Sequence, residues 1–268
     1  MRRSSPIHGG TCFWRWPAVL LLLTAGARAE LRELNTDRPD ATESPVTVDA
    51  GHWQVEMDLV SHTSNRLDGV RTRTWDMAPF NLRYGVSRDL EAGLFFSPYS
   101  RMSTQPRGGL KETLSGSGDL TLRAKLNFWG NDGGETAGGL IADLKLPTAR
   151  AGLGNGHVEG DVILPVAFEL PGGFELGAMT EVDVRHRDDG GSGLVWVNTV
   201  TLGHALCRDV SGYLELTSEA GEGPHMATFN LGVAWKLDAN TQLDAGANLG
   251  LSRTADDVQF FTGLSRRF

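Results

Sequence analysis

The stretch from Leu120 to Phe128, LTLRAKLNF, alternates strictly between apolar and polar residues. Leucine, alanine and phenylalanine occupy the even-numbered positions, whereas Thr121, Arg123 and Lys125 stand at odd-numbered positions. A period of two indicates a β-strand, because successive side chains of a strand point to opposite faces. The stretch therefore predicts a strand with one apolar face and one charged face.

The same alternation recurs along the chain, in His52–Val60, Ala142–Leu146, Phe174–Arg185 and Gln242–Ser252. Several of these segments reach the length of about 9–11 residues that a tilted membrane strand needs. Charges recur on one face of strand after strand, which fits a barrel with a wet lumen. The sequence therefore predicts an all-β fold, an antiparallel transmembrane β-barrel of about 12 strands.

The connections between the predicted strands alternate in length. Long polar stretches such as His62–Thr74 and Tyr99–Ser117 alternate with tight ones such as Val86–Arg88 and Pro171–Gly173. Barrels of Gram-negative outer membranes have short periplasmic turns and longer external loops, so both termini are expected in the periplasm. Pro79 lies inside a predicted strand, where its missing donor predicts a break or a bulge.

Residues 1–29 have the features of a secretory signal peptide. Arg2 and Arg3 precede the apolar run Pro17–Ala25, and the small residues Ala27 and Ala29 predict cleavage after Ala29. The alternative is a retained anchor, for which the apolar run is too short to span a bilayer. Four arginines leave with the signal peptide, which takes the net charge from −8 to −12. So acidic a chain lacks the basic footprint of nucleic-acid-binding proteins.

Signatures of enzymes are weak in this sequence. The glycine-rich stretch Gly152–Gly156 lacks the βαβ context of a nucleotide-binding loop. His204 with Thr201 or Ser211 is a poor match for a hydrolase site. Cys207 stands alone once the signal peptide is removed, which excludes an intramolecular disulfide and a thiolate zinc cluster. We therefore expect no catalytic residues, no cofactor and no metal ligands.

Residues 30–50, here called the leader, separate the signal peptide from the first predicted strand. The leader is polar and shows no alternation. Two interpretations stay open: a solvated periplasmic segment, or a plug-like segment in the mouth of the barrel of residues 51–268. In the second, Arg38 would pair with a lumen carboxylate such as Glu56 or Asp58. The candidate leader motif is Thr36, Asp37, Arg38, Pro39, Asp40, Thr42, Glu43, Ser44 and Pro45.

The charged faces of the predicted strands would point into the lumen. Rings of charge would set the selectivity of an open pore. Alternatively, opposed charges would pair and partly fill the barrel, which we favour because porins with open channels have about 16–18 strands. The lumen-facing candidates are Glu56, Asp58, Arg83, Glu91, Arg123, Lys125, Asp143, Lys145, Glu175, Glu181, Asp183, Arg185 and Asp244.

The run Thr36–Glu56, TDRPDATESPVTVDAGHWQVE, resembles the opening of a family of outer-membrane transporters labelled "MetA-pathway of phenol degradation". Gly118–Gly130 and Leu146–Ala149 resemble the family as well. So does the terminal aromatic Phe268, which also looks like the assembly signal of outer-membrane proteins. The resemblance implies an outer-membrane barrel with a transport role and offers no catalytic motif to carry over.

The sequence thus predicts a channel or transporter for small solutes in the outer membrane. The resemblance implies that these solutes are hydrophobic or aromatic. A structural or adhesive barrel that works through its external loops is the alternative, and an outer-membrane enzyme is a weaker one. The expected partners are outer-membrane lipids, the barrel assembly machinery and the solute, without nucleic acid.

Overall fold

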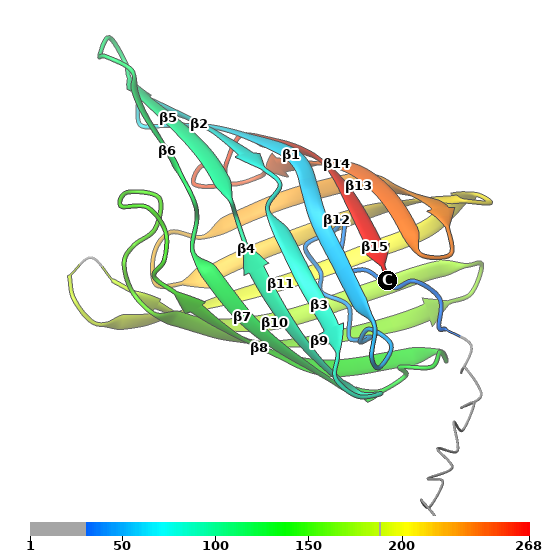
Figure 1. The fold of residues 1–268 in the computed structure, drawn as a ribbon. Helices are drawn as coiled ribbons and strands as arrows, with labels where there is room; N and C mark the ends of the chain where they lie inside the picture. The colour runs from blue at the N-terminus through cyan, green and yellow to red at the C-terminus, as the bar shows by residue number, and fades with distance from the viewer. Residues whose placement is uncertain (1–30, 188) are drawn as a thin grey trace, which may run out of the picture. The chain divides into compact units, whose positions relative to one another are not determined.

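The computed structural model describes residues 31–187 and 189–268, so the predicted signal peptide lies outside the described residues. The chain divides into two units, Met1–Leu31 and Arg32–Phe268, and the second holds every strand. No helix in the described ranges is long and apolar enough to cross a membrane. The strands, drawn in Figure 1, are β1 (Trp53–Leu67), β2 (Val70–Met77), β3 (Phe80–Gly85), β4 (Leu90–Phe96), β5 (Tyr99–Pro106), β6 (Glu112–Gly116), β7 (Leu120–Trp129), β8 (Thr136–Leu146), β9 (Glu159–Leu170), β10 (Phe174–His186), β11 (Ser192–Cys207), β12 (Val210–Gly221), β13 (Met226–Asp238), β14 (Thr241–Gly250) and β15 (Val258–Arg267).

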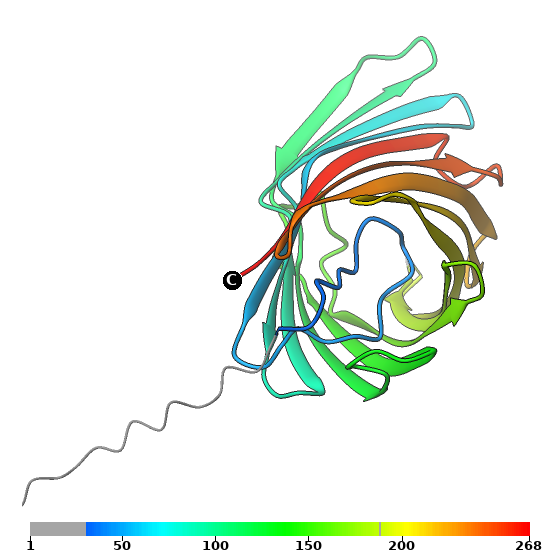
Figure 2. The same ribbon diagram turned by 90° about the vertical axis from the view of Figure 1, so that its right-hand side faces the viewer.

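These strands form one antiparallel sheet that closes on itself. Neighbours in sequence pair from β7 to β15, and β15 then pairs with β1, where Gln54 lies opposite Arg267. The first part of β1, Trp53–Met57, pairs with β3, and the second part, Val60–Leu67, pairs with β2. Strands β2 and β3 therefore lie end to end in the wall. The same holds for β4 with β5 and for β6 with β7. The ring seen in Figure 2 is therefore a barrel of 12 strands, which confirms the predicted fold.

Three strands of the wall are each interrupted once, at neighbouring positions. The breaks fall at Ala78–Pro79, Ser97–Pro98 and Ser117–Asp119. Pro79 has no N–H to donate, and Ala78 before it has a φ of 54°. The break predicted at Pro79 is thus confirmed. Beyond the breaks, β2, β5, β6 and the end of β1 form an extension that leans away from the barrel (Figure 1).

Two of the predicted external loops are wrong, because they are strands. The region His62–Thr74 contains the end of β1 and the start of β2, joined by a turn at Asp68 and Gly69 with φ of 51° and 82°. Positive φ at both central residues is what a tight hairpin turn requires. The region Tyr99–Ser117 forms the hairpin of β5 and β6. Their sequences show no apolar face, because both hairpins extend past the apolar band of the wall.

The two ends of the barrel carry different connections. The end at which Trp53 bonds to Phe268 has tight turns, such as residues 171–173 and 208–209. We call it the terminal end. The opposite end, which we call the loop end, carries longer connections such as residues 147–158. We expect the terminal end to face the periplasm, because short turns lie there in outer-membrane barrels.

The outer surface of the barrel is apolar. Leu122 and Leu126 are 42% and 39% exposed, whereas Arg123 and Lys125 between them are 7% and 0% exposed. The exposure of this strand thus alternates with its sequence, the leucines being exposed and the charged residues buried. Exposed aromatic side chains form a girdle near the terminal end, as at membrane interfaces. Its members are Trp53, Phe128, Trp129, Phe174, Trp235 and Phe268.

Candidate functional site

The leader lies inside the ring of strands, as the view along the barrel in Figure 2 shows. Over its described residues, 31–50, it contains no helix or strand, and a single bridge joins Ala50 to Gly85. Leu34, Thr42 and Val48 are buried. Since a chain without regular structure must satisfy its polar groups elsewhere, the contacts of the leader with the wall decide how it is held.

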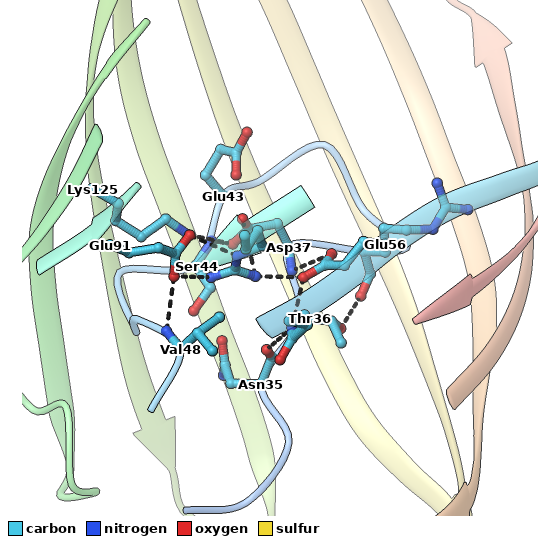
Figure 3. A network of polar contacts seen from close by, with 12 residues as sticks. Asn35, Thr36, Asp37, Glu43, Ser44, Val48, Glu56, Glu91 and Lys125 are labelled. Atoms are coloured by element: carbon cyan, nitrogen blue, oxygen red, sulfur yellow. Dashed lines mark hydrogen bonds and ion pairs between the residues drawn. The ribbon is translucent and has the colours of Figure 1, made fainter. Parts of the chain in front are cut away.

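Asp37 of the leader lies at the centre of a buried charge network (Figure 3). One of its oxygens lies 2.5 Å from Lys125 Nζ, and the other lies 3.2 Å from Arg83 Nη1. Arg83 also contacts Glu56, and its Nε lies 2.7 Å from Glu91 Oε1. The side chains of Arg83, Lys125 and Glu91 are fully buried. Removing Arg83 would leave the buried carboxylates of Glu56 and Glu91 without their cation, which is strongly destabilising.

Carboxylates of the wall also accept hydrogen bonds from the backbone of the leader. The amide of Asp37 donates to Glu56 Oε2 over 3.0 Å, and the amide of Val48 donates to Glu91 Oε2 over 2.8 Å (Figure 3). Hydrogen bonds to an ionised acceptor are about twice as strong as neutral ones. The wall thus fixes both the side chains and the backbone of the leader.

Glu215 on β12 holds the middle of the leader in the same way. It accepts hydrogen bonds from the amides of Ala41 and Thr42 over 3.0 Å and 2.7 Å, and from the Thr42 hydroxyl. Asn230 on β13 donates to the same carboxylate over 2.7 Å. Glu215 is therefore a dedicated acceptor for this turn of the leader, buried to all but 1% of its surface.

Arg38 joins the leader to β1 and β14, which lie on opposite sides of the seam where β1 pairs with β15. Its Nη1 lies 2.5 Å from Asp58 Oδ1 of β1, and its Nη2 lies 2.7 Å from Asp244 Oδ1 of β14. The guanidinium also lies 5.5 Å from the ring centroid of Phe261 on β15. A Cβ at Gly263 would stand 2.1 Å from Nη2, so only glycine leaves room there. The rigid fork of arginine suits two carboxylates at once.

Glu43 ties the leader to the opposite wall. Its Oε1 lies 2.6 Å from Arg123 Nη1, and Arg123 makes two further bonds to Asp143, of 2.8 Å and 2.6 Å. The Arg123 guanidinium stacks 4.4 Å from the ring centroid of Phe95. Arg123 thus connects the leader, β8 and an aromatic ring of β4.

The base of the leader is anchored at the terminal end. Arg32 Nε and Arg267 Nη1 bind the two oxygens of Asp49, at 2.7 Å and 2.8 Å. Arg267 also donates to the Arg32 carbonyl over 2.8 Å. The Thr47 amide donates to Asn131 Oδ1 over 3.0 Å. The last strand therefore holds the segment that precedes the first one.

Two carboxylates of the leader have opposite environments. Although burial opposes ionisation of Asp37, the positive charges of Arg83, Lys125 and Arg123 hold the pKa of its carboxyl well below the usual range. Burial and the charge of Glu215 raise the pKa of Asp40 to about 8. Asp37 is thus a fixed anion, whereas Asp40 changes its charge within the physiological pH range.

A cavity of about 350 Å³ remains between the leader, β4 and the strands β7 to β10. Its lining is mostly charged. The lining carboxylates of Asp161 and Asp183 have oxygens within 4.8 Å of each other and of a carboxylate oxygen of Glu181. The lining residues are Glu43, Phe95, Thr121, Arg123, Asp143, Lys145, Glu159, Gly160, Asp161, Asp183, Val184 and Arg185. The space left beside the leader is therefore polar.

The predicted lumen-facing residues fall into three groups. Glu56, Asp58, Arg83, Glu91, Arg123, Lys125 and Asp244 contact the leader. Asp143, Lys145, Glu181, Asp183 and Arg185 lie around or beside the cavity. Glu175 is exposed at the start of β10, and no ion pair of it is found within the described ranges. Of the two carboxylates expected for Arg38, Asp58 is a partner, whereas Glu56 pairs with Arg83. The motif residues Pro39 and Pro45 accept hydrogen bonds from Tyr213 and Asn127.

Three residues of the network were missed from sequence. Glu215 stands between Leu214 and Leu216, so alternation could have revealed it. Asp161 carried no such signal, because Val162 to Leu164 form a continuous apolar run. Arg267 shares its face of the last strand with Phe261 and Gly263, so no charged alternation marked it. Alternation thus misses a lumen position where the following residues form a continuous apolar run, as after Asp161.

Comparison with solved structures shows the same architecture. The COG4313 outer membrane channel from Pseudomonas putida F1 has a TM-score of 0.67 and 16% identity, over 87% of this chain and 100% of that chain. The β domain of the Bordetella autotransporter BrkA has a TM-score of 0.51 and 14% identity, over 82% and 100% of the two chains. The NanC porin has a TM-score of 0.51 and 7% identity, over 80% and 98%. At these identities the likeness shows the fold alone, which is that of outer-membrane barrels.

No curated protein matches the sequence. The proteins of similar structure named above are channels, porins or transport domains, and their descriptions name no enzyme. The barrel of this protein matches those of outer-membrane channels and porins. The family described as "Putative MetA-pathway of phenol degradation" matches residues 36–268, which include most of the leader and every strand. The chain therefore belongs to this family.

Proposed function

We propose that the protein is a passive channel for small solutes and that its own leader closes the lumen. The observation that carries this proposal is the spread of the leader's partners around the barrel. Arg83 on β3, Lys125 on β7, Glu215 on β12 and Asp244 on β14 all bind the leader. A segment bound on several sides crosses the lumen and does not merely follow one wall.

The chemistry of these contacts suits a closure that can be reversed. Buried ion pairs fix a geometry precisely, yet the cost of removing their charges from water offsets much of the attraction. If the leader were held mainly by apolar side chains, its release would expose those side chains to water at a large cost in free energy. Asp37 and Arg38 regain their hydration when the leader leaves, so docking and release are closer in free energy.

We propose that the solutes include phenolic compounds, as the family description indicates. The cavity beside the leader has a volume of about 350 Å³, within the range of small-molecule sites. Its lining combines the Phe95 ring with charged side chains such as Arg123 and Asp143. An aromatic ring with a hydroxyl group can stack and form hydrogen bonds there, whereas a saturated hydrocarbon can only displace water from charges.

Deletion of Leu31–Ser44 tests the closure. Single-channel conductance in planar bilayers and the entry of phenol into proteoliposomes should both rise relative to the wild type. Deletion of the external stretch Gly152–Gly156 is the matched control and should leave both unchanged. Heat-modifiable mobility on a gel verifies that each barrel is folded. Folded protein with no conductance in any form would contradict the channel.

One observation favours a second candidate function, that of an adhesive barrel. The strands β1, β2, β5 and β6 form an ordered extension past the barrel wall, which conduction through the lumen does not require (Figure 1). Adhesion would make the extension necessary and the lumen dispensable. Removal of the β5–β6 hairpin should then abolish cell attachment, whereas a channel should keep its conductance after the same removal.

A further inference from the structure

One face of the extension carries four arginines. The register places Arg66 of β1 directly opposite Arg71 of β2. One rank nearer the membrane, Arg73 stands between Ser64 and Ser103, and in the following rank Arg101 of β5 lies opposite Trp75. Because side chains alternate between faces, all four arginines share one face of the extension.

No partner for these arginines is found among residues 31–187 and 189–268. Neither an ion pair nor a side-chain hydrogen bond involves Arg66, Arg71, Arg73 or Arg101, in contrast to the arginines of the lumen. The acidic residues Asp76 and Glu112 alternate onto the other face. Like charges directly opposite one another are unfavourable in a sheet, as for Arg66 and Arg71. The face therefore has an uncompensated positive charge.

This basic face continues the lipid-facing surface of the barrel. His62, on the same face of β1, lies opposite Phe260 of β15, which is 56% exposed on the apolar outer surface. Trp75 is exposed level with Arg101, and Met77 and Tyr99 are exposed one rank nearer the barrel. Aromatic side chains of this kind mark the membrane interface. Each rank of residues rises about 7 Å along the strand, so the arginines reach the level of the lipid headgroups.

We propose that Arg66, Arg71, Arg73 and Arg101 bind the phosphate groups of a phosphorylated glycolipid in the outer leaflet. Guanidinium groups match phosphate oxygens in a bidentate manner, and basic clusters beside a membrane attract anionic headgroups. The aromatic residues below hold the acyl chains at the depth that brings the phosphates to the arginines. The site rests on the loop end lying outside the cell and is independent of solute conduction.

The test compares binding of diphosphoryl lipid A with binding of its dephosphorylated form. The full-length protein in detergent is titrated with each lipid, and bound lipid is counted by native mass spectrometry. The wild type should bind the phosphorylated form more tightly. The triple variant Arg71→Gln, Arg73→Gln, Arg101→Gln should lose about a hundredfold in affinity, because each headgroup contact contributes about fivefold. The exposed Arg208→Gln at the terminal end is the control and should bind like the wild type.

Several outcomes would overturn the proposal. Equal binding of the two forms of lipid A would show that acyl chains alone are recognised. Equal affinity of the triple variant, with heat-modifiable folding verified, would remove the arginines from the site. Competition by inorganic pyrophosphate at concentrations comparable to the lipid would assign the face to a soluble anion. Equal binding to phosphatidylglycerol vesicles would remove the preference for the outer-leaflet glycolipid. Conductance stays unchanged in the variant if the channel and the lipid site are separate.

Discussion

Arg38→Ala removes the cation that joins the leader to both sides of the seam. In the wild type, three nitrogen–oxygen contacts link this guanidinium to Asp58 and Asp244, at 2.5, 2.7 and 3.2 Å. The Asp244 side chain is fully buried. Loss of one partner of a buried ion pair costs about 3–5 kcal/mol, because the remaining charge is left uncompensated. Since the Arg38 side chain keeps some contact with water, we take the lower value, which favours undocking by roughly a hundredfold.

Hydrogen exchange and conductance report this change independently. Backbone amides of the leader, among them those of Asp37, Thr42 and Val48, should exchange faster in the variant, while the strand amides keep their protection. Single-channel openings in planar bilayers should become more frequent or larger. Arg253→Ala removes an exposed arginine paired with Asp68 and should change neither measurement, because exposed pairs contribute little.

A second variant separates the geometry from the charge. In Gly263→Ala the new Cβ would stand 2.1 Å from Arg38 Nη2, so the guanidinium must move while its charge stays. We expect a smaller effect in the same direction. If leader exchange and conductance match the wild type in Arg38→Ala, with the barrel folded, the ion pairs of Arg38 do not hold the leader and the reasoning is refuted.

Gly85→Ala places a Cβ 2.2 Å from the backbone of the leader, so leader hydrogen exchange should rise; unchanged exchange would contradict the close approach. Since the pKa of Asp40 is raised to about 8 from 3.8, the docked leader holds a proton that the free leader releases between those values, and docking weakens as the pH rises through this window. Asp40→Asn should therefore reduce the rise in conductance across this window, and a rise equal to that of the wild type would exclude this carboxyl. Leu122→Arg should lower the free energy of unfolding in lipid by about 2–4 kcal/mol; no change would mean that the side chain does not face acyl chains. An epitope inserted after Gly108 should be accessible on intact cells and one after Gly172 should not; the reverse would invert the orientation.

Alternation predicted the wall of the barrel because the membrane enforces it. Residues such as Leu122 and Arg123 face lipid and lumen in turn, and each environment rejects the other's side chain. The same reasoning failed for the hairpin at Asp68 and for the one at residues 107–111, because strands in water have no face that must be apolar. Alternation thus reveals only the part of a strand that lies between the lipid and the lumen.

The partners of the leader could be predicted only in kind. A polar segment with Arg38 beside strands with inward carboxylates indicates ion pairs, and Asp58 was among the expected partners. The pairing with Asp244 joins positions 206 residues apart and depends on how the ring closes. No local pattern contains that information. The charge of the face formed by Arg66, Arg71 and Arg101 was likewise hidden, because it arises from cross-strand register.

The seam between β1 and β15 gives the leader a place in the order of assembly. Its partners lie on both sides of that seam: Asp58 on β1, Asp244 on β14 and Arg267 on β15. Until the last strand pairs with the first, these groups are far apart and the leader has no complete binding surface. The leader is synthesised before every strand of the barrel, yet it must be among the last segments to reach its final position. A barrel that stalls before closure stays unplugged, so the docked leader distinguishes a finished molecule from an unfinished one.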